Sequence, residues 1–474
     1  MKTQTAKQPR SFNLCIAALA VGLACSGCGR HAGGPTKSDV GRGAGEGDPL
    51  AWVLVPHEGE DRVDRDIRDC QAQLRSKVNP ESALERLGWL FVAKARTSFD
   101  PAFYRRAEQC AMGLDSRRPG STEAMLLRGH ALQNQHCFKE AEPLARGLVA
   151  KRGLPFDYGL LGDVLMEQGR LAEATEAYQT MIDLRPDLQS YARGAHIRWL
   201  KGDLAGAVEL MDLAAGAASP ADPESAAWVN TRLAFYHLQK QAFEAAHRVC
   251  DTAVGFQKDY APALLLRGRI LLAEGETAAA IEPLERSAQL NPFPEYQWTL
   301  AEALRAEGRT SEAFAVEKQL RQTGAAADPR TVALFLATRS QQTQTALRLA
   351  ERELDERGDV FTHDALAWSL QAAGRIEDAC VHMEKALAEG TQDARLSFHA
   401  AVIAAKSGYL DEARRRFETT FEQMHLLLPS EQEQLQAAAL AVDTDDLVDL
   451  APDAGSASTH FSAPGAQLPR GAEE

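Results

Sequence analysis

Histidine, cysteine and serine are the residues whose spacing could reveal catalysis or metal binding in this chain. The twelve histidines are scattered, with no HExxH motif and no pair four residues apart, so no helix presents two imidazoles to a zinc ion. The chain also lacks a GxSxG nucleophile elbow, a GxxxxGK[ST] phosphate loop and a fixed pair of carboxylates for glycoside cleavage. We therefore expect no enzyme, no cofactor and no metal site.

Two cysteines near the start of the chain are candidates for acylation, the one chemical modification that the sequence supports. Three basic residues and no acidic residue accompany an apolar run of residues 14–24, which is too short to cross a bilayer and predicts a secretory signal peptide over residues 1–24. The sequence VGLAC that ends at Cys25 resembles a bacterial lipobox, in which the cysteine becomes the acylated first residue of the mature protein. Gly22 departs from the usual leucine, Cys28 is the alternative acylation site, and secretion without a lipid is the other alternative.

The lipobox resemblance also implies where the protein lies. Two or three acyl chains, palmitate among them, would anchor the protein stably, because one chain alone binds marginally. Ser26, directly after Cys25, implies sorting to the outer membrane by resemblance to the enterobacterial rule. Residues 25–48 are glycine-rich and predict a flexible linker of about 25 Å. We expect a lipoprotein that faces the periplasm and touches the membrane only through its lipid.

Ten alanines set the period of the remaining chain. Successive members lie 33 or 34 residues apart, except for one gap of 39. A period of this length indicates a repeat protein. The ten residues are Ala107, Ala141, Ala174, Ala207, Ala246, Ala280, Ala313, Ala346, Ala379 and Ala413.

Other positions keep the same phase and identify the repeat. Tyr158, Leu161, Gly162, Leu165, Gly169, Leu171, Ala174, Tyr178 and Pro186 follow one pattern of types, and Leu264, Gly268, Leu271, Gly275, Ala280, Leu284 and Pro292 repeat it. This pattern closely resembles the tetratricopeptide repeat. The resemblance implies an all-α, right-handed solenoid of about ten helix-turn-helix repeats, in which small residues allow the two helices of a repeat to approach closely.

The phase divides the chain into segments. We expect an N-terminal capping helix within residues 49–80, the repeat array over residues 81–428, and a short helix followed by a disordered acidic tail over residues 429–474. Extra residues around positions 97–101 predict a longer first hairpin loop. His136, Gln241 and Gln341 stand where other repeats have a turn glycine, so these three turns are predicted to be strained or irregular.

The resemblance also implies which residues face a ligand. Positions 2, 5, 9 and 12 of each first helix line the concave groove in this family, and five of the six tryptophans fall on them. Aromatic rings give large contact areas for little rotamer entropy, and polar groups lie between them. The predicted partner-binding groove comprises Trp89, His130, Trp199, Trp228, Phe235, Arg269, Trp298, Arg305, Phe335, Trp368 and Phe398. The alternative is that these aromatic side chains pack between neighbouring repeats.

Charge and the remaining cysteines narrow the choice of ligand. The formal net charge is −14, which argues against a nucleic-acid ligand because phosphate binding relies on clustered Lys and Arg. Cysteines 70, 110, 137, 250 and 380 lie far apart in the sequence and are interpreted as small buried side chains. Export would permit a disulfide, and Cys110 with Cys137 is the least implausible pair.

A scaffold that binds a protein or an extended peptide is the function that these features favour, and we do not expect a small-molecule ligand. One alternative is a glycan-binding lipoprotein that stacks sugar rings on the groove tryptophans. Another is a structural spacer whose groove is filled by its own acidic tail, with residues 443–449 reaching Arg269 or Arg305. Scarce asparagine along the groove departs from the better-known peptide-binding relatives.

Overall fold

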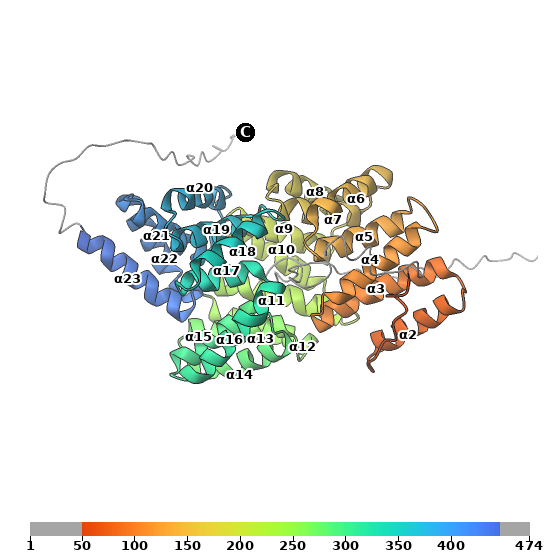
Figure 1. The fold of residues 1–474 in the computed structure, drawn as a ribbon, viewed down its shortest axis with the longest axis horizontal. Coiled ribbons are helices and arrows are strands. Elements are labelled where there is room, and N and C mark those ends of the chain that lie inside the picture. Colours follow the sequence, from red (N-terminus) through yellow and green to blue (C-terminus); the bar gives the residue numbers. More distant parts are fainter. Residues whose placement is uncertain (1–49, 446–474) are drawn as a thin grey trace, which may run out of the picture.

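The structure, a computed structural model, describes residues 50–445. The predictions for the signal peptide, Cys25, Cys28, the glycine-rich linker and most of the acidic tail fall outside these residues. Within the described part every regular element is a helix and there is no strand. The expected all-α fold is confirmed (Figure 1).

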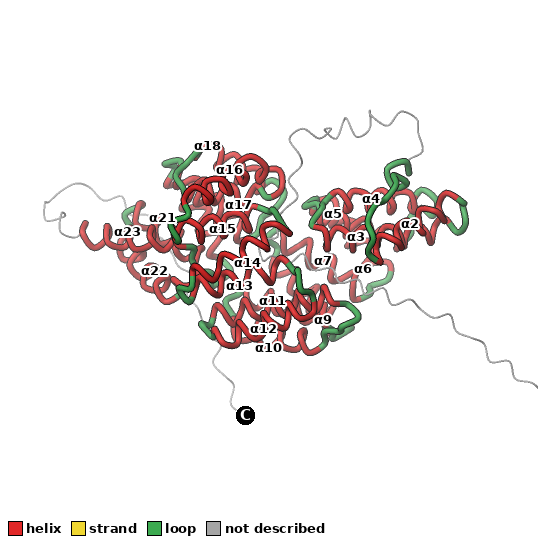
Figure 2. Tube along the Cα trace, turned by 90° about the horizontal axis from the view of Figure 1, so that it is seen from below, coloured by secondary structure: helices red, strands yellow, loops and turns green. Residues whose placement is uncertain are grey.

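Twenty of the described helices form ten consecutive antiparallel pairs, one for each predicted repeat. In chain order these pairs are α3 (Pro80–Ser98) and α4 (Ala102–Asp115), α5 (Thr122–Asn134) and α6 (Phe138–Lys151), α7 (Pro155–Glu167) and α8 (Leu171–Leu184), α9 (Leu188–Leu200) and α10 (Leu204–Gly216), α11 (Pro223–Gln239) and α12 (Phe243–Phe256), α13 (Ala261–Ala273) and α14 (Thr277–Leu290), α15 (Pro294–Ala306) and α16 (Thr310–Ala327), α17 (Pro329–Thr338) and α18 (Thr343–Leu354), α19 (Val360–Ala372) and α20 (Ile376–Leu387), and α21 (Ala394–Lys406) and α22 (Leu410–Glu422). Figure 2 shows the same helices from below.

The ten periodic alanines explain why the pairs form. Each lies in the second helix of its repeat, and all ten are fully buried. The first helix contributes a matching small residue: a β-carbon on Gly162 would lie 2.3 Å from the Tyr178 ring, and one on Gly268 would lie 2.4 Å from Leu284. The helices therefore touch where the sequence places small side chains, as ridge-into-groove packing requires.

The turns that lack glycine are strained, as predicted, although one of them differs in detail. His136 and Gln241 both have φ near +56°, a left-handed conformation that costs a non-glycine residue energy. In the eighth repeat, Ser340 and Gln342 take positive φ values and Gln341 does not. The strain is therefore shared by the two neighbours of the predicted residue.

The prediction of a longer first hairpin loop is wrong. Helix α3 continues for 19 residues to Ser98, and the loop before α4 spans only residues 99–101. Phe99 ends the helix with a φ of +54°. The additional residues therefore lengthen the helix, since a helical residue satisfies its own backbone hydrogen bonds and a loop residue does not.

Additional helices flank the array at both ends. At the N-terminal end, α2 (Arg62–Arg75) is capped by Asp61, whose side chain accepts a hydrogen bond from the Asp64 amide, and it buries Ile67 and Cys70 against the first repeat. At the other end, η1 (Met424–Leu426) and α23 (Pro429–Asp445) follow the tenth repeat. Within residues 50–445, no helix has both the length and the apolar content needed to cross a bilayer.

The superhelix turns far enough to touch itself. The third and fourth repeats meet the loops that precede α19 and α21: the Gly358 amide donates to the Glu167 carbonyl at 3.0 Å, and Thr391 Oγ1 donates to the Leu200 carbonyl at 2.5 Å. Arg357 forms an ion pair with Glu167 at the same contact. These partners lie about 190 residues apart in the chain, so the array is a closed ring at this level.

The five cysteines between residues 50 and 445 are free thiols. Cys70, Cys110 and Cys250 are buried, and Cys137 and Cys380 are partly buried. Burial raises the pKa of the Cys250 thiol to about 11. These cysteines thus behave as the small buried side chains that the sequence predicted, and Cys110 and Cys137 form no disulfide in this structure.

Candidate functional site

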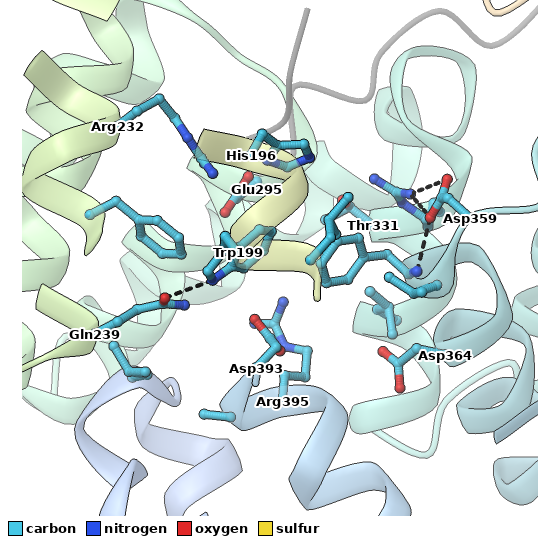
Figure 3. A pocket seen from close by; sticks show the side chains of 18 of the residues that line it. His196, Trp199, Arg232, Gln239, Glu295, Thr331, Asp359, Asp364, Asp393 and Arg395 are labelled. Carbon is cyan, nitrogen blue, oxygen red and sulfur yellow. Dashed lines mark hydrogen bonds and ion pairs between the residues drawn. The ribbon is translucent and has the colours of Figure 1, made fainter. Parts of the chain in front are cut away.

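The closed ring encloses a cavity of about 150 Å³ at its centre. Residues from the first helices of the third to tenth repeats line it, together with Leu171 at the start of α8, the loops at residues 357–359 and 393, and two leucines that follow α22. Figure 3 shows these side chains converging from both sides of the ring. First helices form the concave face in this architecture, so the cavity belongs to the groove.

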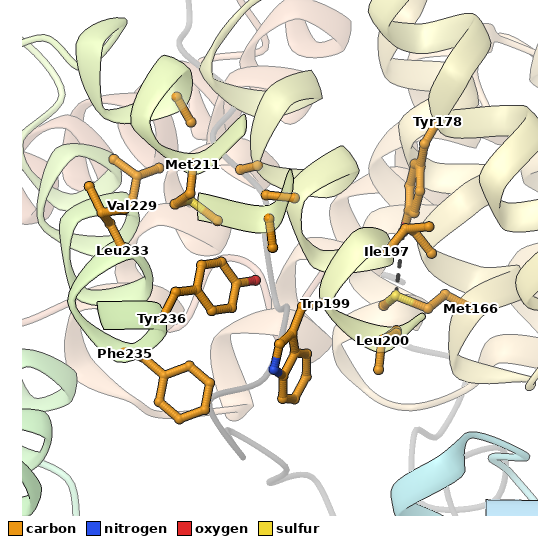
Figure 4. Close-up of a cluster of buried hydrophobic side chains, with 14 of the residues drawn as sticks. Met166, Tyr178, Ile197, Trp199, Leu200, Met211, Val229, Leu233, Phe235 and Tyr236 are labelled. Atoms are coloured by element: carbon orange, nitrogen blue, oxygen red, sulfur yellow. Dashed lines mark hydrogen bonds between the residues drawn. The ribbon is translucent and has the colours of Figure 1, made fainter. Parts of the chain in front are cut away.

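Four of the predicted groove residues meet at this cavity. They are Trp199, Phe235, Arg269 and Trp298. Trp199 is central: its ring stacks on Phe361 of the ninth repeat, with centroids 5.7 Å apart, and meets Phe235 edge-on at 5.8 Å. Its indole nitrogen donates to Gln239 Oε1 at 2.7 Å. Figure 4 shows how Trp199 and Phe235 lie at the edge of the larger apolar core. The aromatic wall therefore joins repeats that the sequence separates widely.

The other predicted groove residues do not reach the cavity. Trp89 and His130 contact each other in the first two repeats, with ring centroids 5.5 Å apart. Trp228 is partly buried against the core of the fifth repeat. Arg305 donates to Glu317 at 2.7 Å. These four side chains lie on helices of the array and are engaged by neighbouring residues.

Three further predicted groove aromatics are core residues that do not line the cavity. Phe335 and Phe398 are fully buried and Trp368 is 3% exposed. Trp368 donates to Thr338 Oγ1 at 3.0 Å and stacks on His399 with centroids 4.0 Å apart. For these three the interpretation as packing between repeats fits, and the interpretation as ligand-facing side chains does not. Phe335 meets the Trp298 ring and Phe398 meets the Trp368 ring, so each packs against the preceding repeat.

An ionic cluster forms one wall of the cavity at the ring contact. Arg357 pairs with Glu167 and Asp359, and Arg330 Nη1 lies 3.2 Å from Asp359 Oδ1. Burial alone would raise the pKa of Asp359, but Arg330 and Arg357 hold it below its usual value. Burial raises the pKa of Glu167 despite Arg357. Paired buried charges of this kind fix orientation more than they add stability.

A second group of polar side chains has weaker partners. Arg269 Nη1 lies 3.4 Å from Glu295 Oε1, and burial raises the pKa of Glu295. Burial likewise raises the pKa of Asp393, which caps α21 by accepting from the Leu396 amide at 3.1 Å. His196 is 5% exposed, its Nδ1 lacks a hydrogen-bond partner within the described residues, and burial beside Arg232 holds its pKa well below its usual value. The cavity therefore presents an imidazole whose pKa burial lowers and two carboxyls whose pKa values burial raises.

The lining of the cavity offers features that suit binding. No group of three His, Cys, Asp or Glu side chains in residues 50–445 is placed to hold a metal ion. What the cavity offers is an aromatic wall with charged and neutral polar groups around it, which is how recognition sites combine contact area with orientation.

The sequence missed the part of the chain that lies in the groove. Leu426 and Leu428 line the cavity, and Arg269 Nη2 donates to the Leu426 carbonyl at 3.0 Å. Arg269 and Arg305 thus find partners other than residues 443–449, of which residues 443–445 belong to α23 and the rest lie beyond the described chain. The helix prediction after Pro429 is confirmed, but nothing in its sequence marked the residues before it as groove ligands.

Comparison with known proteins supports the repeat assignment. Residues 126–189, 160–223 and 265–329 match the family model of the tetratricopeptide repeat, so these stretches are tetratricopeptide repeats, and the whole array has the corresponding solenoid fold. The comparison with curated proteins gives no match. The comparisons indicate no enzyme family.

Several solved structures are similar to this chain at low identity. The human IFIT1 dimer with PPP-AAAA is 15% identical, with 69% of this chain and 78% of that chain covered and a TM-score of 0.45. Yeast Tom70 is 13% identical, with 82% and 97% covered and a TM-score of 0.34. PilF of Pseudomonas aeruginosa is 15% identical, with 42% and 90% covered and a TM-score of 0.36. Similarity at this level carries no argument about a ligand.

Proposed function

We propose that this protein is a lipid-anchored periplasmic scaffold that binds a protein through an extended peptide in its concave groove, and that it supports assembly of an envelope complex. The observation that carries the binding function is the central cavity, to which first helices of eight successive repeats contribute. A preformed groove loses little entropy when it binds, so the cost falls mainly on the peptide. The tetratricopeptide match supports a binding role.

The test of binding uses photo-crosslinking in native envelopes. A photoreactive residue at Gln239, which lines the cavity and is partly buried, should capture one envelope protein. The matched position is Gln179 on the exposed face of α8, which should capture none. Equal capture at both positions, or capture at Gln179 alone, would contradict the groove as the binding site. Substituting Trp298 or Trp368 is a poorer test, since both are core residues.

The membrane anchor is the second part of the proposal and rests on the sequence. Acylation at Cys25, with Cys28 as the alternative, would place the repeats on the periplasmic side of the outer membrane. Labelling cells with a palmitate analogue should mark the wild type and the Cys28→Ser variant but not the Cys25→Ser variant. Fractionation of the labelled protein would then decide between the inner and the outer membrane. If the Cys25→Ser variant is labelled and the Cys28→Ser variant is not, Cys28 is the acylated residue.

The structure gives no support to the glycan alternative. Sugar stacking needs an exposed aromatic face, whereas Trp89, Trp199, Trp298 and Trp368 are each no more than 8% exposed. Trp228 alone among the groove tryptophans is partly exposed. A single partly covered ring does not make the row of platforms that an extended glycan would need.

A further inference from the structure

The residues that follow the tenth repeat lie along the concave face of earlier repeats. Four successive first helices each contribute one contact, in the order of the chain. His425 Nε2 lies 3.0 Å from the Leu238 carbonyl of α11, and Arg269 of α13 donates to the Leu426 carbonyl. Ser430 bonds Glu302 of α15, and Gln434 donates to the Thr338 carbonyl of α17 at 2.9 Å. Residues 424–436, called here the groove segment, therefore follow the path expected of a bound peptide.

The contacts in the middle of the groove segment are specific. The Ser430 amide donates to Glu302 Oε2 at 3.1 Å and its hydroxyl donates to Oε1 at 2.8 Å. Glu431 is fully buried and accepts from Arg395 Nε at 2.6 Å and from the Leu428 amide at 2.9 Å. Burial alone would raise the pKa of Glu431, but Arg395 holds it below its usual value. The Ser430 hydroxyl thus donates to the carboxylate of Glu302, and the Glu431 carboxylate pairs with the guanidinium of Arg395.

Apolar contacts accompany these polar ones. Leu427 and Leu428 are 4% and 3% exposed and belong to the same buried cluster as Trp298. Pro429 follows them and begins α23, a position that suits proline. The chemistry of the groove segment is therefore two buried leucines, a proline, a serine and a glutamate at the start of a helix.

A terminal cap alone would not need these contacts. A capping helix has to cover only the exposed face of the last repeat, and α23 does touch α21 and α22. The four ordered contacts are made instead with the fifth to eighth repeats, across the groove from the tenth. Because Leu426 and Leu428 also line the central cavity, the groove segment occupies part of the site to which the partner is assigned above.

We propose that the groove segment is an internal ligand, and that the external partner is a peptide with the same chemistry: two leucine-type residues, proline, serine or threonine, and an acidic residue at a helix start. Such a peptide competes with the groove segment for Glu302, Arg395 and Arg269. This inference deepens the proposed function and rests on it for the identity of the site. Partner binding then requires release of α23, which makes the segment an autoinhibitory contact.

The test uses the full chain and a fluorescent peptide that copies residues 423–436. In the Ser430→Ala/Glu431→Gln variant the groove segment loses the hydroxyl bond to Glu302 and the charge that pairs with Arg395, so hydrogen exchange of residues 424–436 should rise and the peptide should bind at least about tenfold more tightly than to the wild type. Glu433→Gln is the matched control, since Glu433 is exposed on the same helix. It should behave as the wild type. Folding is checked by circular dichroism, and Gln434→Ala provides a milder second variant.

The outcomes separate this inference from the proposed function. Adding Glu302→Gln to the double variant should reduce the gain in peptide binding, because glutamine offers one acceptor oxygen and no charge where the amide and hydroxyl of the serine use two carboxylate oxygens. The inference is overturned if exchange rises but the peptide does not bind, or if neither exchange nor binding changes. Peptide binding without any crosslinked envelope protein at Gln239 would support the internal ligand and contradict the scaffold function.

Discussion

At the residue scale, Asp328 is the carboxyl whose environment opposes its charge most clearly. It caps α17 by accepting from the Thr331 amide at 3.1 Å and from its hydroxyl at 2.6 Å. Burial raises its pKa from 3.8 to about 7, although Arg330 and Thr331 act in the opposite direction. A raised carboxyl pKa favours the protonated form in the folded state. Its stabilising effect is therefore complete below about pH 4 and is lost as the pH rises toward 7.

The variant Asp328→Asn should remove this dependence. Asparagine can still cap the helix but does not ionise, so the free energy of unfolding of the wild type, relative to the variant, should fall between pH 4 and pH 7.5. The fall should be up to about 4 kcal/mol, since each pKa unit corresponds to about 1.4 kcal/mol. Urea denaturation at both pH values measures it. Asp203→Asn, at the exposed N-cap of α10, controls for the effect of replacing a carboxylate by an amide at a helix cap. If the difference in the free energy of unfolding between the wild type and Asp328→Asn is the same at both pH values, Asp328 does not have a raised pKa.

The groove tryptophans show what residue patterns can and cannot predict. The repeat phase correctly placed them on first helices, because one face of a helix is fixed by a period of 3.6 residues. It could not say what covers that face. Trp368 is covered by the next repeat, whereas Trp199 meets Phe361 from five repeats further along the array. The second kind of neighbour has no local signal in the sequence.

Truncating these tryptophans should separate packing from exposure. Trp368→Ala removes a side chain that is 3% exposed and hydrogen-bonded, so it should lower the free energy of unfolding by about 3–5 kcal/mol. Trp228→Ala removes a partly exposed ring and should cost less than half as much. Thermal or chemical denaturation gives the comparison. A similar loss in both variants would mean that Trp228 is packed as tightly as Trp368.

At the scale of the element, the helix ends were predictable and the helix lengths were not. Glycine marked six turns between paired helices, and all six have positive φ: Gly169, Gly202, Gly275, Gly308, Gly374 and Gly408. In contrast, the extra residues near position 100 extend α3 by more than one turn rather than widening a loop. A turn depends on one backbone conformation, which residue type reveals. The choice between helix and loop depends on what the added turn packs against.

Introducing glycine at one turn and removing it from another should change the free energy of unfolding in opposite directions. Ser340 has a φ of +50°, so Ser340→Gly should relieve strain and raise the free energy of unfolding by about 0.5–1 kcal/mol. Gly374 has a φ of +81° and open space where a β-carbon would lie. Gly374→Ala should therefore lower the stability by about 1 kcal/mol through its backbone alone. Changes of the same sign in both variants would show that φ does not decide stability at these turns.

At the scale of the whole molecule, the solenoid was predictable and its closure was not. The period of the alanines gives the number of repeats and the pairing of helices. Closure depends on small rotations that add up over six repeats, so no single repeat encodes where the ring meets. The central cavity and the groove segment both follow from closure, which is why the sequence identified four cavity residues without revealing that they surround one space.

The turn glycines provide a direct test of closure. A β-carbon on Gly169 would lie 2.1 Å from the Gly358 carbonyl oxygen, whereas the same position on Gly275 has nothing within 4 Å. Their φ values, +76° and +82°, are nearly the same, so alanine imposes a similar backbone cost at both. Any further effect of Gly169→Ala therefore reports the contact between the third repeat and the loop before the ninth. A second pair of positions offers the same comparison. A β-carbon on Gly202 would lie 2.6 Å from the Gly390 carbonyl oxygen, whereas one on Gly308 would have nothing within 4 Å.

Gly169→Ala should open the ring, and Gly275→Ala should leave it closed. Opening separates the third repeat from the loop before the ninth and breaks, among other contacts, the hydrogen bond from the Gly358 amide to the Glu167 carbonyl. A hydrogen bond of this kind contributes about 1 kcal/mol, so Gly169→Ala should lose at least about 1 kcal/mol more stability than Gly275→Ala. Small-angle X-ray scattering should show a larger radius of gyration for Gly169→Ala and Gly202→Ala but not for Gly275→Ala and Gly308→Ala. If all four variants scatter alike and lose similar stability, the third and ninth repeats do not touch in solution, and the groove is open along its length.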